Sequence, residues 1–90
     1  MVTLEEAKTY LKVDTSDEDN LIESLIHTAE RLVQDTSRLD DEAFASESAT
    51  VRIAILYAVA YLFEHREEAD HYELDLTLRA LLFGVREVRF

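Results

Sequence analysis

The chain has no cysteine, no proline and no tryptophan, and Gly84 is its only glycine among 90 residues. Without cysteine no disulfide can form, which excludes a small secreted domain braced by disulfides and permits a reducing intracellular setting. The scarcity of glycine and proline disfavours a turn-rich β fold and excludes glycine-rich phosphate-binding loops. Alanine, leucine, glutamate, aspartate and arginine dominate instead, and this composition favours helices.

Long apolar runs are also missing. The longest, residues 53–63, is much shorter than the roughly 20 residues that a membrane-spanning helix needs. A signal peptide begins with basic residues that are followed by an apolar run. The first residues of this chain are acidic instead, so we expect no signal peptide. A chain of this length has room for one core, so residues 1–90 are predicted to form a single soluble domain that does not associate with membranes.

Positive charge is scarce. The chain has 9 lysines and arginines but 20 aspartates and glutamates, which gives a net charge of −11. The imbalance lies mainly in the first half, with a net charge of −9 over residues 1–48 and −2 over residues 49–90. Tight binding of nucleic acid needs cationic groups that displace counterions from phosphates. The chain is therefore predicted to repel DNA rather than bind it.

The hydrophobic pattern predicts an all-α fold, a small bundle of about four helices with a long second and third helix. The first helix is predicted over residues 3–11, with Thr3 and Glu6 forming a capping box. Ser16 is the predicted N-cap of a second helix over residues 17–36, whose apolar side chains recur at helical spacing.

Residues 37–47 lose this periodicity and are predicted to form the main loop. A third helix is predicted over residues 48–69. A short last helix over residues 76–83 would be capped by Asp75 and ended by Gly84.

The centre of the third predicted helix is apolar on every side, and such a helix needs neighbours all round. The other three helices of so short a chain cannot easily enclose it, so part of its surface is predicted to face another subunit. The side chains that we expect in the core of the subunit are Ile53, Ile55, Leu56, Val59 and Leu62. For Tyr57 and Tyr61 both a core position and a subunit interface remain open, because tyrosine is enriched at interfaces.

Catalytic chemistry has little support in the sequence. There is no cysteine nucleophile, and no serine lies in a glycine-flanked turn, so we predict no enzymatic activity and no cofactor. Glu64, His65, Glu68 and His71 are close in sequence, but the two histidines are six residues apart and would diverge on a helix. We interpret them as surface residues rather than a metal site.

Two acidic runs, residues 17–19 and 40–42, lack the glycine and the glutamate spacing of a calcium loop, and we interpret them as a helix cap and a solvated loop. The C-terminal residues carry Arg79, Arg86 and Arg89 against Glu87. These arginines either pair within the subunit or meet the acidic first half of a neighbouring copy in a head-to-tail contact.

Several stretches of the chain follow the pattern of one known family: residues 2–14, residues 17–26 with Ala29, the apolar helix from Ala54 into residues 61–67, and Leu81, Leu82 and Arg86. In these residues the chain resembles the phage head-tail connector, or DNA-packaging adaptor, proteins. The chain departs from the family pattern at His65, which replaces an asparagine, and at Leu76 and Gly84, near which the family has prolines.

The resemblance implies a homo-oligomeric ring in the virion, assembled in the host cytoplasm, that joins the portal protein to tail-completion proteins. DNA would pass through the ring without sequence-specific binding. We expect the acids Asp17, Glu18, Asp40, Asp41 and Glu42 to face this channel. The alternative function is a small acidic regulator or protein-binding module that acts as a dimer.

Overall fold

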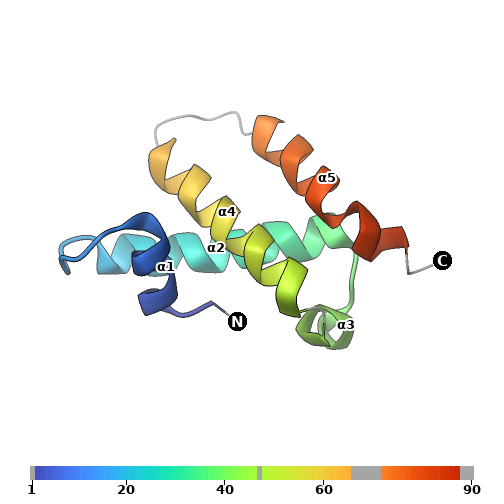
Figure 1. The fold of residues 1–90 in the computed structure, drawn as a ribbon, viewed down its shortest axis with the longest axis horizontal. Helices are drawn as coiled ribbons and strands as arrows, with labels where there is room; N and C mark the ends of the chain where they lie inside the picture. Colours follow the sequence, from blue (N-terminus) through green and yellow to red (C-terminus); the bar gives the residue numbers. More distant parts are fainter. Residues whose placement is uncertain (1, 47, 66–71, 88–90) are drawn as a thin grey trace.

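The computed structural model describes residues 2–46, 48–65 and 72–87. These residues form helices α1 (Leu4–Leu11), α2 (Asp19–Ser37), α3 (Asp41–Ser46), α4 (Ser48–Glu64) and α5 (Tyr72–Glu87), shown in Figure 1. The predicted all-α bundle is confirmed. None of the described helices is both long enough and apolar enough to cross a membrane.

Helix α1 begins at the predicted capping box. The Thr3 Oγ1 atom accepts a hydrogen bond from the Glu6 backbone N–H at 3.1 Å, and Glu6 Oε1 accepts one from the Thr3 N–H at 3.0 Å. The predicted start of α2 is wrong, because Glu18 rather than Ser16 occupies the N-cap position. The Ser16 carbonyl accepts a hydrogen bond from the Asp19 N–H at 3.3 Å, so the chain turns once before the helix begins.

The predicted loop over residues 37–47 is wrong over residues 41–46, which form α3. Asp40 caps this short helix, since its Oδ1 accepts a hydrogen bond from the Ala43 N–H at 2.8 Å. Asp41 and Glu42 follow in the first turn, where the helix dipole favours negative charge. Phe44 anchors α3 in the core. A helix of 6 residues is too short to show apolar periodicity, which is why the pattern suggested a loop.

The boundaries of the last two helices also differ from the prediction. Helix α4 ends at Glu64, with His65 in a turn, and residues 66–69 of the predicted helix lie outside the described residues. Helix α5 begins at Tyr72, so Asp75 lies in its first turn instead of capping it, and the backbone stays helical through Gly84 to Glu87. A glycine inside a helix costs about 1 kcal/mol relative to alanine. Burial of Leu74, Leu78 and Leu82 along α5 offsets this cost.

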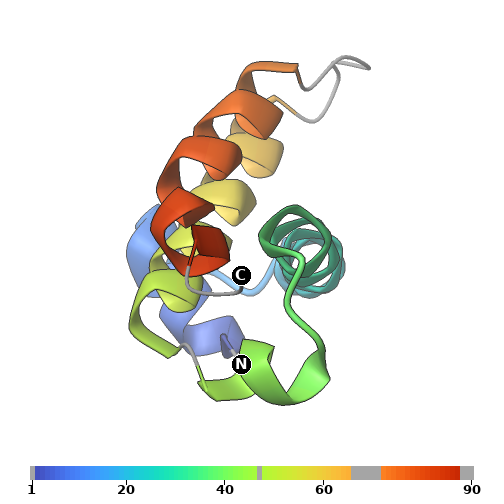
Figure 2. The same ribbon diagram turned by 90° about the vertical axis from the view of Figure 1, so that its right-hand side faces the viewer.

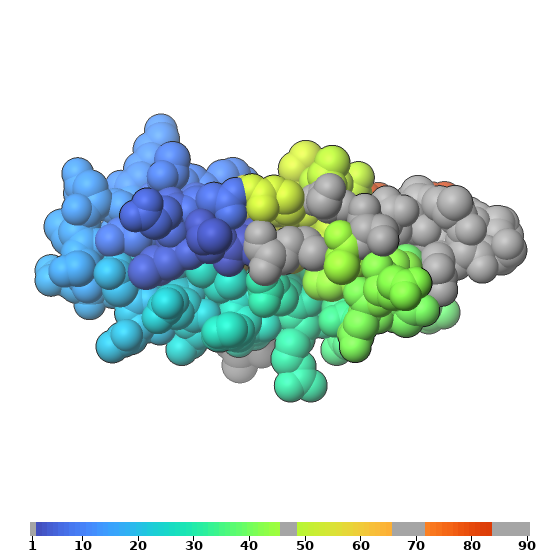
Figure 3. Space-filling view, turned by 90° about the horizontal axis from the view of Figure 1, so that it is seen from below, coloured from blue at the N-terminus to red at the C-terminus, as the bar shows by residue number. Residues whose placement is uncertain are grey.

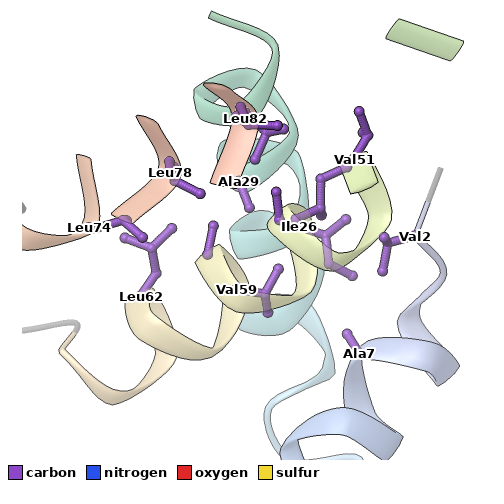
Figure 4. Close-up of a cluster of buried hydrophobic side chains, with 14 of the residues drawn as sticks. Val2, Ala7, Ile26, Ala29, Val51, Val59, Leu62, Leu74, Leu78 and Leu82 are labelled. Carbon is purple, nitrogen blue, oxygen red and sulfur yellow. The ribbon is translucent and has the colours of Figure 1, made fainter. Parts of the chain in front are cut away.

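Helix α4 is the centre of the bundle and contacts every other described helix. It crosses α2, while α1 and α5 lie on its two sides, and α5 runs back in the opposite direction to α4 (Figures 1 and 2). Leu74 and Leu78 point from α5 toward α4, as Figure 4 shows. Ile55, Val59 and Leu62 are buried as predicted, and Leu56 is partly buried. The core prediction for Ile53 is wrong, because its side chain is 62% exposed.

Candidate assembly surface

Helix α4 presents an apolar face to solvent on the side away from its buried residues. Ile53, Leu56, Tyr57 and Ala60 follow one another at spacings of three, one and three residues, which places them on one face of the helix. Ile53 is exposed and the other three are partly buried. We call these four residues the α4 face. A surface helix typically carries charged or polar residues on the side opposite to its buried face.

An open groove borders the α4 face where α4 packs beside α1. It is lined by Glu5, Glu6, Thr9, Tyr10 and Leu56. The carboxylate of Glu6 forms an ion pair with Arg52 of α4, which fixes the two helices relative to each other. The side chain of Tyr10 is 49% exposed. The groove therefore combines an apolar floor with an acidic edge.

Helix α5 carries a second outward face. Tyr72, Leu76, Arg79 and Phe83 are spaced by four, three and four residues, so they share one side of the helix, and this side is opposite to the buried leucines. The exposed fractions of Tyr72, Leu76 and Phe83 are 64%, 47% and 59%. We call these four residues the α5 face. Its apolar part escaped sequence-based prediction because the helix was expected to begin only at residue 76.

The tyrosines singled out from the sequence occupy intermediate positions. Tyr57 and Tyr61 are both partly buried against the core, so neither is fully enclosed by the subunit. The Tyr61 ring stacks on the His65 ring with centroids 4.1 Å apart, and His65 Nδ1 lies 2.9 Å from the Tyr61 carbonyl oxygen. The stacking gives His65 a structural role. Glu68 and His71, the other members of the sequence cluster, lie outside the described residues. In the part of the chain that the structure describes, no three metal-ligating side chains gather.

Comparison with known protein families identifies the chain. The family model described as "Phage gp6-like head-tail connector protein" matches residues 1–88. The chain belongs to this family. No curated protein and no solved structure matches it significantly. Membership makes the chain a phage head-tail connector protein, a virion component that interacts with portal and tail proteins, and confirms the resemblance seen in its residues.

The acids predicted to face the channel form two groups in this connector protein. Asp17 and Glu18 lie at the start of α2, whereas Asp40, Asp41 and Glu42 follow its end. The 19 residues of α2 separate the two groups by about 28 Å at 1.5 Å per residue. Figure 3 shows the segment before α2 at one end of the molecule and α3 toward the other. A channel lined by both groups would carry two separate clusters of carboxylates.

Some of these acids also have structural roles in the connector subunit. Besides the capping contact of Asp40, the Asp41 Oδ1 atom accepts a hydrogen bond from Gln34 Nε2 at 2.7 Å, which ties α3 to α2. Asp17 is exposed and Glu18 is half-buried. Asp17, Glu18 and Glu42 are thus the acids of the set that can be replaced without loss of the Asp40 cap or of the Gln34 bond.

The three arginines of the C-terminal region are described to different extents. Arg79 Nε lies 3.0 Å from Asp75 Oδ2, an exposed pair one helical turn apart. Such a pair contributes about 0.3–0.5 kcal/mol, so it leaves Arg79 available for other contacts. Arg86 belongs to the last turn of α5, and Arg89 lies outside the described residues.

Proposed function

We propose that this connector protein is a subunit of a homo-oligomeric ring that assembles below the portal in the host cytoplasm and receives the tail-completion proteins. The match of the connector family to residues 1–88 is the observation that carries the proposal. The structure adds physical support, because the described residues leave large apolar side chains exposed on the outward sides of α4 and α5, and exposed apolar patches favour an interaction with another protein surface. The proposed role is structural and needs no enzymatic activity.

The ring would form a channel through which DNA passes, and the acids of the first half of the chain favour this role. Like charges repel at close approach, and salt screens this repulsion only beyond about 8–10 Å at physiological ionic strength. Carboxylates such as those of Asp17 and Glu42 on the channel wall would keep the phosphate backbone from adhering. Passage would then be fast and independent of sequence.

The oligomeric state separates the ring from a dimeric regulator. Native mass spectrometry and negative-stain microscopy of the purified protein, and of heads that carry it, are expected to show rings of more than two copies. A dimer that binds a basic protein and forms no ring in solution or on heads would contradict the proposal and favour the regulator.

Reversing Arg86 and Arg89 to glutamate is expected to abolish ring assembly, since it places acids against the acidic first half of the neighbouring copy. Native mass spectrometry measures the assembly, and far-UV circular dichroism is expected to show unchanged helicity. The matched control is Lys12→Glu with Arg31→Glu, which makes the same charge change on the exposed surface of the first half. Rings of unchanged size from the Arg86→Glu, Arg89→Glu variant would exclude a role of the basic end in assembly.

A further inference from the structure

The α4 face and the α5 face belong to different helices of the subunit. The groove that borders the α4 face is lined by residues of α1 and α4, whereas α5 lies on the other side of α4 and packs on α4 and α2 (Figure 1), with Leu74, Leu78 and Leu82 buried and the α5 face exposed. A two-fold dimer joins identical patches and closes at two copies. A head-to-tail contact between two different patches covers both faces of each inner copy and extends until a ring closes.

The charges on the two faces are complementary. Arg79 lies in the middle of the α5 face with a side chain that is 63% exposed. Glu5 and Glu6 line the groove beside the α4 face. Pairing α5 with α5 would oppose Arg79 to its own copy, whereas pairing α5 with the α4 face brings the guanidinium near the exposed carboxylate of Glu5; the Glu6 carboxylate already pairs with Arg52. Opposite charges across an interface favour the correct partner and penalise the alternative.

The two faces also differ in relief. The α5 face is a ridge of large side chains, Tyr72, Leu76 and Phe83, which spans about 17 Å along the helix axis. The α4 face has the small Ala60 one turn beyond Leu56 and Tyr57, and the open groove beside it. Helices pack by placing the ridge of one into the groove of the other.

We propose that the α5 face of one subunit packs on the α4 face of the next, with Arg79 directed toward Glu5, and that this is the repeating contact of the ring. The proposal rests on the proposed ring function and names the occupant of both faces as a second copy of this chain. It predicts that a subunit needs both faces to assemble into a ring. It also predicts that an intact α5 face on one subunit and an intact α4 face on another are enough to form one contact.

The first test uses two variants that each disable one face. Ile53→Glu with Ala60→Glu disables the α4 face, and Leu76→Glu with Phe83→Glu disables the α5 face; none of these four side chains is fully buried. Each variant alone is expected to lose assembly and remain monomeric. An equimolar mixture is expected to form a heterodimer that does not extend, because one intact face of each kind remains. Ser24→Glu with Thr28→Glu adds the same charge to the exposed side of α2 and is expected to assemble as the wild type does.

The second test uses the absence of cysteine, which makes introduced thiols unique. A variant with Ile53→Cys and Phe83→Cys, and a second with Ile53→Cys and Leu76→Cys, are treated with a short bismaleimide in solution and on purified heads. A ladder of dimers, trimers and larger species is expected from at least one of them. Ser24→Cys with Phe83→Cys is the control pair and is expected to give no ladder.

The outcomes separate this contact from the ring itself. Rings that persist in either face variant, or heads that carry rings but give no ladder, overturn the contact and leave the ring function intact. Cross-links from position 76 or 83 to the portal or a tail protein would assign the α5 face to that partner and overturn the contact as well. Protein that is absent from heads and monomeric at every concentration overturns both proposals.

Discussion

Replacing Leu78 with alanine is expected to lower the free energy of unfolding by about 2–5 kcal/mol. Leu78 is 1% exposed and lies between Leu74 and Leu82 on the buried side of α5, so its loss leaves a cavity against α4 and α2. A domain of this size has a total stability of about 5–13 kcal/mol, so this is a large fraction. Thermal unfolding followed by circular dichroism is expected to show a Tm lower by roughly 10–30 °C.

Leu76→Ala is the matched control for this prediction, because it makes the same change two residues away on the exposed side of α5. Leu76 is 47% exposed, so we expect a loss of less than about 1 kcal/mol. The two variants should separate folding from assembly, with Leu78→Ala acting on Tm and Leu76→Ala weakening the contact between subunits. Equal losses of Tm would show that the two sides of α5 are not buried and exposed as described.

Reversing Asp17, Glu18 and Glu42 to lysine is expected to give the proposed ring an affinity for DNA and to slow DNA ejection from virions. The net charge of each subunit changes from −11 to −5, and the change is repeated in every copy of the ring. Each new contact between a lysine and a phosphate releases counterions, so raising the salt from 50 to 200 mM should weaken binding about three- to fourfold per contact. Fluorescence anisotropy of labelled DNA and ejection kinetics of assembled virions measure the two effects.

The control replaces the same residues by asparagine and glutamine, which removes charge without adding cations. This variant is expected to leave DNA binding undetectable and ejection close to the wild-type rate. Both variants keep Asp40 and Asp41, so the cap of α3 and its bond to Gln34 remain. Unchanged ejection by the lysine variant, with no DNA binding at low salt, would place these acids away from the DNA path.

Local sequence signals predicted those parts of the fold that local interactions determine. The capping box at Thr3 and Glu6 depends on residues three positions apart and was predicted correctly, as was the amphipathic course of α2. The start of α5 was placed four residues too late because Asp75 is a good cap in isolation. Burial of Leu74 beside Leu62 extends the helix backwards, and that contact joins residues far apart in the chain.

The surface was harder to predict than the core for a related reason. An all-apolar helix reveals that some of its side chains lack cover, but it does not reveal which ones. The sequence favoured Ile53 as a core residue, whereas the packing of α1, α2, α3 and α5 leaves that side of α4 open. Tyr72 and Phe83 could have been found from their spacing with Leu76, had the full length of α5 been expected.

The central position of α4 has a consequence for synthesis of the protein on the ribosome. Residues 1–47 emerge before α4 exists, and the apolar stripe of α2 then has no complete partner. Nascent segments with exposed apolar surface tend to aggregate. The surplus of acids in the same residues makes neighbouring nascent chains repel one another, so we expect the charge that would later face DNA to keep the unfinished polypeptide dispersed until α4 has been synthesised.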